Sequence, residues 1–199
     1  MERSLVAGRS CGSCNVCCEA LTIDEPTLRK PQGMLCRNAR ADHSCGIYDA
    51  RPPTCRDFYC GWRRLKWVPE PLRPDRSGVL LRPYRPKATS DDPPRLGIAI
   101  TLLTVASLEA EGLAEAVASS VAGNVPTFLH VPGPPGHTAA IAEINEPIAA
   151  AVRRLDKPAI LDFLRKARAE GAAGTFTRIV LAPEVPGQDG AATGLQSPQ

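Results

Sequence analysis

The chain has 199 residues, and its 8 cysteines all lie between Cys11 and Cys60. Disulfide-stabilised miniproteins distribute their cysteines over the whole fold, so the absence of cysteine from residues 61–199 argues against that class. A hydrophobic content of 43% excludes a chain that is disordered throughout. The net charge of +3 is small, but residues 61–95 carry a local charge of +5 and residues 96–199 a charge of −3.

The start of the chain and its apolar runs predict a cytoplasmic protein. Met1–Gly12 contains Arg3 and Arg9 without a long apolar run between them, so we expect no secretory signal. The longest apolar run, Leu96–Ala106, is about half of the ~20 residues that a membrane-spanning helix needs. In a reducing compartment, clustered cysteines more often bind metal or do redox chemistry than form disulfides.

Composition divides the chain into four parts. Residues 1–67 hold all the cysteines and few periodic apolar positions, which predicts a small module held together by bound metal. Residues 68–95 contain 7 prolines and predict a basic connector with a short strand at Gly78–Leu81. Residues 96–184 have the pattern of a small α/β segment, and residues 185–199 that of a disordered tail. The expected fold class is α+β, with the cysteine module packed on or linked to the α/β segment.

The first half of the α/β segment alternates strand and helix patterns. A continuous apolar run predicts a buried strand at Leu96–Thr104. A run rich in Ala, Glu and Leu predicts a helix at Ser107–Ala122, ended by Gly123 and Asn124. A second strand at Thr127–Val131 leads into a turn at Pro132–Gly136.

The second half of this segment is predicted to be mostly helical. Apolar residues recur at helical spacing from Ile141 through Ile144, Ile148 and Val152 to Leu155. Asp156 can then cap a further helix that has Pro158 in its first turn and Gly171 beyond its end. The apolar side of that helix consists of Ile160, Phe163, Leu164 and Ala167, and a final strand is expected at Phe176–Leu181.

The cysteines form a compact block and a loose block. Cys11, Cys14, Cys17 and Cys18 make two overlapping C-x2-C spacings that gather four sulfurs on one side, whether the backbone is a loop or a helix. The loose block consists of Cys36, Cys45, Cys55 and Cys60. Buried free cysteines are common in cores, but eight in so hydrophilic a segment favour metal binding.

The number of thiols leaves the kind of metal site open. Eight match two four-ligand sites, or one four-ligand cluster with additional redox thiols. Vicinal Cys17 and Cys18 would strain a single tetrahedral ion, which favours a multi-iron cluster or two centres. An iron–sulfur cluster is therefore slightly preferred over zinc as the cofactor.

Other side chains near the cysteines are expected to support the site. His43 could replace a thiolate, although a loop histidine is more often only solvated. Arg51 and Arg56 are expected to offset the negative charge of a four-thiolate site, the alternative being ion pairs within the module. His130 and His137 are interpreted as structural or surface residues.

The two blocks resemble the YkgJ-like cysteine-cluster family of CxxCxxCC proteins, over roughly residues 8–62. The first motif is Cys11-Gly-Ser-Cys14-Asn-Val-Cys17-Cys18, and the second is Cys45-Gly-Ile-Tyr48-Asp-Ala-Arg51-Pro52-Pro-Thr-Cys55-Arg56-Asp-Phe58-Tyr-Cys60, with Cys36 ahead of it. The resemblance implies chelation of zinc or iron by all eight cysteines. A similar block occurs in flagellin lysine N-methylase, which is thought to use an iron–sulfur cluster, but residues 63–199 show no motif tied to methyl transfer.

Three hypotheses about function follow. The first is a cytoplasmic metal-binding protein with an iron–sulfur cluster or zinc. The second is a zinc-stabilised interaction module without catalytic activity, with the basic connector as its contact surface for an unknown protein partner. The third is an iron–sulfur-dependent protein-modifying enzyme similar to flagellin lysine N-methylase. The sequence carries no nucleic-acid-binding fold signature, so neither nucleic acid nor a membrane is the expected partner.

Overall fold

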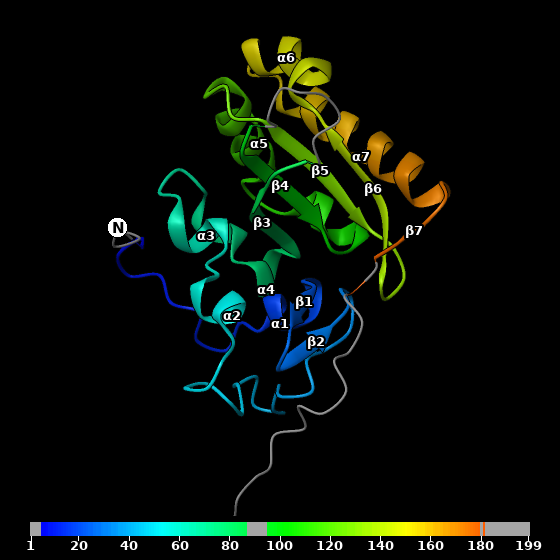
Figure 1. Ribbon diagram of the computed structural model, residues 1–199. Coiled ribbons are helices and arrows are strands. Elements are labelled where there is room, and N and C mark those ends of the chain that lie inside the picture. Colours follow the sequence, from blue (N-terminus) through cyan, green and yellow to red (C-terminus); the bar gives the residue numbers. More distant parts are fainter. Residues whose placement is uncertain (1–4, 87–94, 180, 182–199) are drawn as a thin grey trace, which may run out of the picture.

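The computed structural model describes residues 5–86, 95–179 and 181, and it confirms an α+β fold (Figure 1). Its centre is a five-stranded sheet in the order β3-β4-β5-β6-β7. β4 and β5 are parallel and the other neighbours are antiparallel. The strands are β3 (Val79–Tyr84), β4 (Gly97–Leu102), β5 (Thr127–Pro132), β6 (His137–Glu143) and β7 (Thr177–Arg178).

Three helices cover one face of this sheet: α5 (Leu113–Ala122), α6 (Asn145–Arg153) and α7 (Lys157–Ala173). Side chains alternate between the two faces along a strand, so every second residue of the central strands points to these helices. Leu81, Ile100 and Leu129 are examples. Together with Ile160 and Leu164 of α7 they form the main hydrophobic core. The predicted apolar side of the last helix is therefore confirmed.

The opposite face of the sheet carries a buried polar pair. Thr101 of β4 is opposite His130 of β5, and the Thr101 hydroxyl lies 3.0 Å from His130 Nδ1. Burial and the nearby Arg82 guanidinium lower the pKa of His130 to about 4, so its imidazole is neutral near pH 7. The structural interpretation of this histidine is confirmed.

The N-terminal part consists of short elements at one end of the molecule (Figure 1). Its own hydrophobic cluster is small, with Ile23, Leu28 and Cys36 as buried members. The short lengths of the elements and this small cluster agree with the prediction that the segment builds little core. The elements are α1 (Val16–Ala20), β1 (Ile23–Glu25), β2 (Leu28–Lys30), α2 (Pro53–Asp57), α3 (Gly61–Arg64), the 3-10 helix η1 (Glu70–Leu72) and α4 (Pro74–Ser77).

The N-terminal part is fastened to the sheet at several points. Trp62 of α3 lies in the main core. Arg9 donates to the carbonyls of Trp62 and Val68 at 2.6 and 2.7 Å. Buried Gln32 donates to the carbonyl of His137 at 2.6 Å, beside the turn between β5 and β6. β3, from the proline-rich stretch, is an edge strand of the same sheet, so these contacts join the two ends of the chain into one fold.

The predicted strands at Leu96–Thr104 and Thr127–Val131 are confirmed as β4 and β5, and the short strand at Gly78–Leu81 as the start of β3. Asp156 caps α7 as expected, by accepting a hydrogen bond from the Ala159 amide. Asn124, with a positive φ of 54°, follows the end of α5 as predicted.

Two helix predictions were wrong at their starts. Ser107–Ala122 is not one helix, because Gly112 at φ 85° separates the 3-10 helix η2 (Val105–Glu109) from α5. A Cβ at Gly112 would lie 2.6 Å from Pro69 Cβ, so this close approach needs glycine. Ile141 belongs to β6, where it pairs with His130, and Leu155 is an exposed residue beyond α6 with φ of 54°, so the helical spacing applies only from Ile144 to Val152.

Two predictions near the C-terminus also differ from the structure. Gly171 lies inside α7, which ends at Ala173, because a residue without a side chain lets the helix approach Ala140 of β6. The strand expected at Phe176–Leu181 is reduced to β7, and residue 180 lies outside the described residues. The predicted disordered tail at 185–199 also lies outside them. Within the described residues, no helix is long and apolar enough to cross a membrane.

Candidate metal centre

All eight cysteines are described, and all are free thiols. Cys11 and Cys14 lie in the turn before α1, and Cys17 and Cys18 lie on that helix. Cys36 and Cys45 lie in the long loop that follows β2, Cys55 is in α2, and Cys60 caps the start of α3. The fold thus brings the compact and the loose sequence blocks to the same end of the molecule.

Four thiols gather around Cys55; we call Cys18, Cys36, Cys45 and Cys55 the Cys55 set. Cys18 and Cys55 pack on the small cluster that contains buried Cys36. Burial raises the pKa of the Cys55 thiol, and the charges of the three other members raise it further. Mutual effects of this kind require short distances between sulfurs.

The remaining thiols are linked through Cys11 and Cys14, which influence both Cys17 and Cys60 or are influenced by them; we call Cys11, Cys14, Cys17 and Cys60 the Cys60 set. Burial raises the pKa of Cys60, and the charge of Cys11 adds to this effect. Burial likewise raises the pKa of Cys14, to which Asp75 and Cys60 contribute. Cys60 packs against the main core rather than against the small cluster. Compared with the two blocks in the sequence, Cys18 and Cys60 have therefore exchanged groups.

The vicinal pair lies where the two sets meet. A hydrogen bond between the side chains raises the pKa of Cys17 and lowers that of Cys18 to about 6. After burial, the next influences on Cys17 are Cys18, Cys11 and Cys14. Cys18 is instead influenced by the cations Lys30 and Arg51. Neighbouring residues of one short helix thus face different surroundings.

Cations lie beside the Cys55 set. Lys30 is only 5% exposed, and its ammonium donates to the carbonyls of Glu19, Pro31 and Met34 at 2.8, 3.0 and 2.7 Å. Burial lowers the pKa of Lys30, and the charges of Cys36 and Cys18 oppose this effect. Arg51 donates to the Tyr48 carbonyl at 2.7 Å and stacks 3.7 Å from the Tyr48 ring centroid. These contacts hold two positive groups near the thiols of this set.

The chemistry of the donors fits a thiophilic metal, although the side chains do not yet enclose a metal position. Four soft sulfur donors in each set, with cations nearby, are the ligand type of zinc and of iron–sulfur clusters. Among the described residues, no three or more His, Cys, Asp or Glu side chains form a group that could hold a metal ion as they are placed.

The histidines lie elsewhere in the described structure. His43 is an exposed loop residue with a positive φ of 65°, and His137 Nδ1 lies 3.1 Å from the Pro135 carbonyl. His130 is held within the sheet by its contact with Thr101. Sequence reasoning missed Lys30, because nothing in its spacing indicates that a lysine after a short strand would be buried beside thiols.

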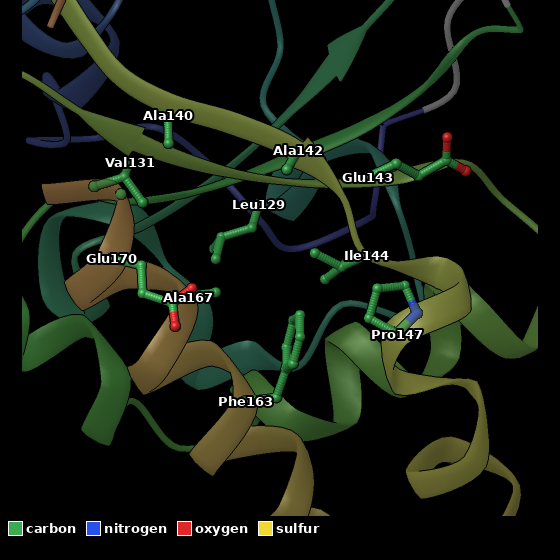
Figure 2. Close-up of a pocket in the computed structure, with 11 residues that line it drawn as sticks. Leu129, Val131, Ala140, Ala142, Glu143, Ile144, Pro147, Phe163, Ala167 and Glu170 are labelled. Carbon is green, nitrogen blue, oxygen red and sulfur yellow. The ribbon is translucent and has the colours of Figure 1, made fainter. Parts of the chain in front are cut away.

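A separate hollow of about 340 Å³ lies between the sheet and α7. Figure 2 shows Phe163 and Ala167 of α7 facing Leu129 and Val131 of β5 across it. Glu143 and Glu170 are the charged residues of its lining, which is otherwise mostly hydrocarbon, and no cysteine borders it. The hollow is thus a feature of the sheet domain, separate from the thiols.

Comparison with protein-family models, curated proteins and solved structures finds no match for the chain.

Proposed function

We propose that the protein is a cytoplasmic metal-binding protein whose eight N-terminal cysteines hold an iron–sulfur cluster, with zinc as the alternative. The observation that carries this proposal is the gathering of eight free thiols, distant in sequence, in a segment with a very small core of its own. Binding energy at thiolate sites becomes folding energy, so a metal would stabilise this segment.

The charges around the thiols support the same proposal. Four thiolates on one divalent ion leave a net negative site, and cations near the sulfurs stabilise it. Lys30 and Arg51 meet this need at the Cys55 set, and at Cys60 the Arg63 residue opposes the rise in pKa that burial causes. The resemblance of the two cysteine motifs to the YkgJ-like family is a second argument for metal chelation.

The vicinal pair and the excess of thiols favour iron and sulfide over a single zinc ion. Neighbouring cysteines rarely ligate the same tetrahedral ion without strain, whereas a larger cluster or several centres can use all eight. A zinc-stabilised interaction module is the second candidate, because four thiols in each set match tetrahedral zinc by number. If a cluster is bound, it can supply electron transfer or Lewis-acid chemistry.

Anaerobic purification followed by metal analysis separates these candidates. The iron–sulfur proposal predicts a coloured protein with iron and acid-labile sulfide. A colourless protein that contains zinc, without iron or sulfide, would support the second candidate. A chain that carries none of these and does not take up either metal would contradict metal binding altogether.

Cys14→Ser tests the role of the thiols directly. This change should lower the metal content and increase hydrogen exchange in the N-terminal segment, because one ligand of the site is lost. Ser13→Ala is the matched control, since Ser13 is an exposed neighbour in the same turn and is not a thiol. Equal metal content in the two variants would show that Cys14 is not a ligand.

A further inference from the structure

We infer that the eight cysteines form two separate metal centres, one held by the Cys55 set and the other by the Cys60 set. The vicinal pair is then divided, with Cys18 in the first centre and Cys17 in the second. This inference rests on the proposed metal-binding function and adds the number of centres and the ligands of each.

Backbone contacts bring the members of the Cys55 set together. The Cys36 amide donates to the Cys18 carbonyl at 2.9 Å, which ties the loop after β2 to α1. Ala39 packs on the cluster that contains Cys36 and forms an isolated β-bridge with Cys45. Cys55 of α2 packs on the same cluster. Three segments of the chain, α1, the loop after β2 and α2, thus converge on one small apolar cluster.

The Cys60 set is assembled by different contacts. The Cys14 amide donates to the Cys11 carbonyl at 2.8 Å and closes the turn before α1. Arg73 donates to the same carbonyl at 2.7 Å and pairs with Asp75 at 2.9 Å, which anchors the turn beside α4. Cys60 is the residue before α3, a helix that packs on β3, and it lies near Cys11 and Cys14.

The geometry of α1 explains how the vicinal pair can serve both centres. Successive residues of a helix point about 100° apart, and the Cys17 and Cys18 side chains touch each other through a hydrogen bond. Cys18 packs with Cys55 on the small apolar cluster, of which Cys17 is not a member, and Cys17 is instead influenced by the charges of Cys11 and Cys14. One helical turn therefore lies between the two sets and supplies one sulfur to each.

Two neighbouring variants test this division in the full-length chain. Cys18→Ala should remove one centre and Cys17→Ala the other, so that each variant retains about half of the wild-type metal. Anaerobic alkylation with iodoacetamide, read by mass spectrometry, identifies the thiols that bound metal no longer protects. In Cys18→Ala the three remaining thiols of the Cys55 set should react, while the whole Cys60 set stays protected. In Cys17→Ala the pattern should reverse.

The wild-type chain provides a measurement that does not depend on the folding of a variant. Native mass spectrometry should count two metal centres per chain, and stepwise removal with a chelator should expose the thiols as two groups of four with the membership given above. A single centre, or groups that follow the sequence blocks 11–18 and 36–60, would overturn the division while leaving metal binding intact. A chain that binds no metal would overturn the proposed function itself.

Discussion

At the residue scale, Arg9 links the cysteine-bearing segment to the core. Its side chain is only 10% exposed, while that of its partner Glu70 is 66% exposed. The guanidinium donates to the carbonyls of Trp62 in α3 and of Leu65 and Val68 between α3 and η1. It also lies 5.1 Å from the Trp62 ring centroid. One cation thus donates to three carbonyls, of which that of Leu65 also accepts from the Val68 amide.

Arg9→Met should lower the free energy of unfolding by about 2–4 kcal/mol, because hydrogen bonds from a charged donor are lost and partly buried carbonyls remain unpaired. Glu70→Gln is the matched control and should cost less than about 1 kcal/mol, since it removes only the exposed side of the network. Urea unfolding followed by tryptophan fluorescence measures both. Similar losses in the two variants would show that the ion pair, and not the carbonyls, carries the contact.

The sequence predicts the cysteines of the candidate site but not how they are grouped. The spacing identified the eight cysteines and placed Arg51 among groups that could offset thiolate charge, and Arg51 does lie beside Cys18 and Cys55. The grouping was not predictable, because Cys60 and Cys18 change partners through contacts made in three dimensions. Those contacts depend on where α3 docks against β3, which no local spacing encodes.

At the scale of elements, Gly171 shows how packing overrides a local signal. Glycine often ends a helix, but α7 continues past Gly171 for two further residues. A Cβ added here would lie 2.9 Å from Ala140 Cβ and 3.3 Å from Val131 Cγ2. Gly171 therefore allows the helix to pack closely on the sheet, and it does not terminate the helix.

Gly171→Ala should lower the free energy of unfolding by about 1 kcal/mol. Alanine gains about 1 kcal/mol in helix propensity, but overpacking against a strand costs about 1–3 kcal/mol. Gly174→Ala is the control, because its added Cβ would meet no atom closer than 3.5 Å, and it should change stability by less than about 0.5 kcal/mol. A Gly171→Ala variant more stable than the wild type would refute the packing explanation.

The elements that were predictable share a physical basis. β4 and β5 are short apolar runs buried on both sides, and α7 has both a capping aspartate and an apolar side. The failures at Gly112 and Ile141 arise where a neighbouring element decides the backbone: Pro69 lies against the first, and β5 pairs with the second. The sequence pattern thus predicts elements whose own residues determine their conformation. It fails where a contact with another element determines the conformation.

At the scale of the whole molecule, the two ends of the fold are stabilised by different means. The sheet and helices α5, α6 and α7 share a large cluster of fully buried side chains, including Leu102, Leu113 and Ile148. The cysteine-bearing end has a small cluster and thiols that burial keeps protonated, as at Cys14 and Cys55. If metal is withdrawn, the sheet and its helices should therefore stay folded, because burial stabilises them. The cysteine-bearing end should lose stability, because its thiolates would no longer bind metal.

Metal removal tests this asymmetry in the reduced, full-length protein. After treatment with a strong chelator, amides between Cys11 and Cys60 should lose most of their protection from hydrogen exchange, measured by mass spectrometry. Amides of β4, β5 and α7 should remain protected, because Cys60 is the one cysteine among the described residues that packs against their core, at its margin. The same chelator saturated with zinc is the control and should leave the exchange pattern unchanged. Equal loss of protection in both parts would mean that the fold is one cooperative unit, and no loss in either would mean that metal contributes nothing to stability.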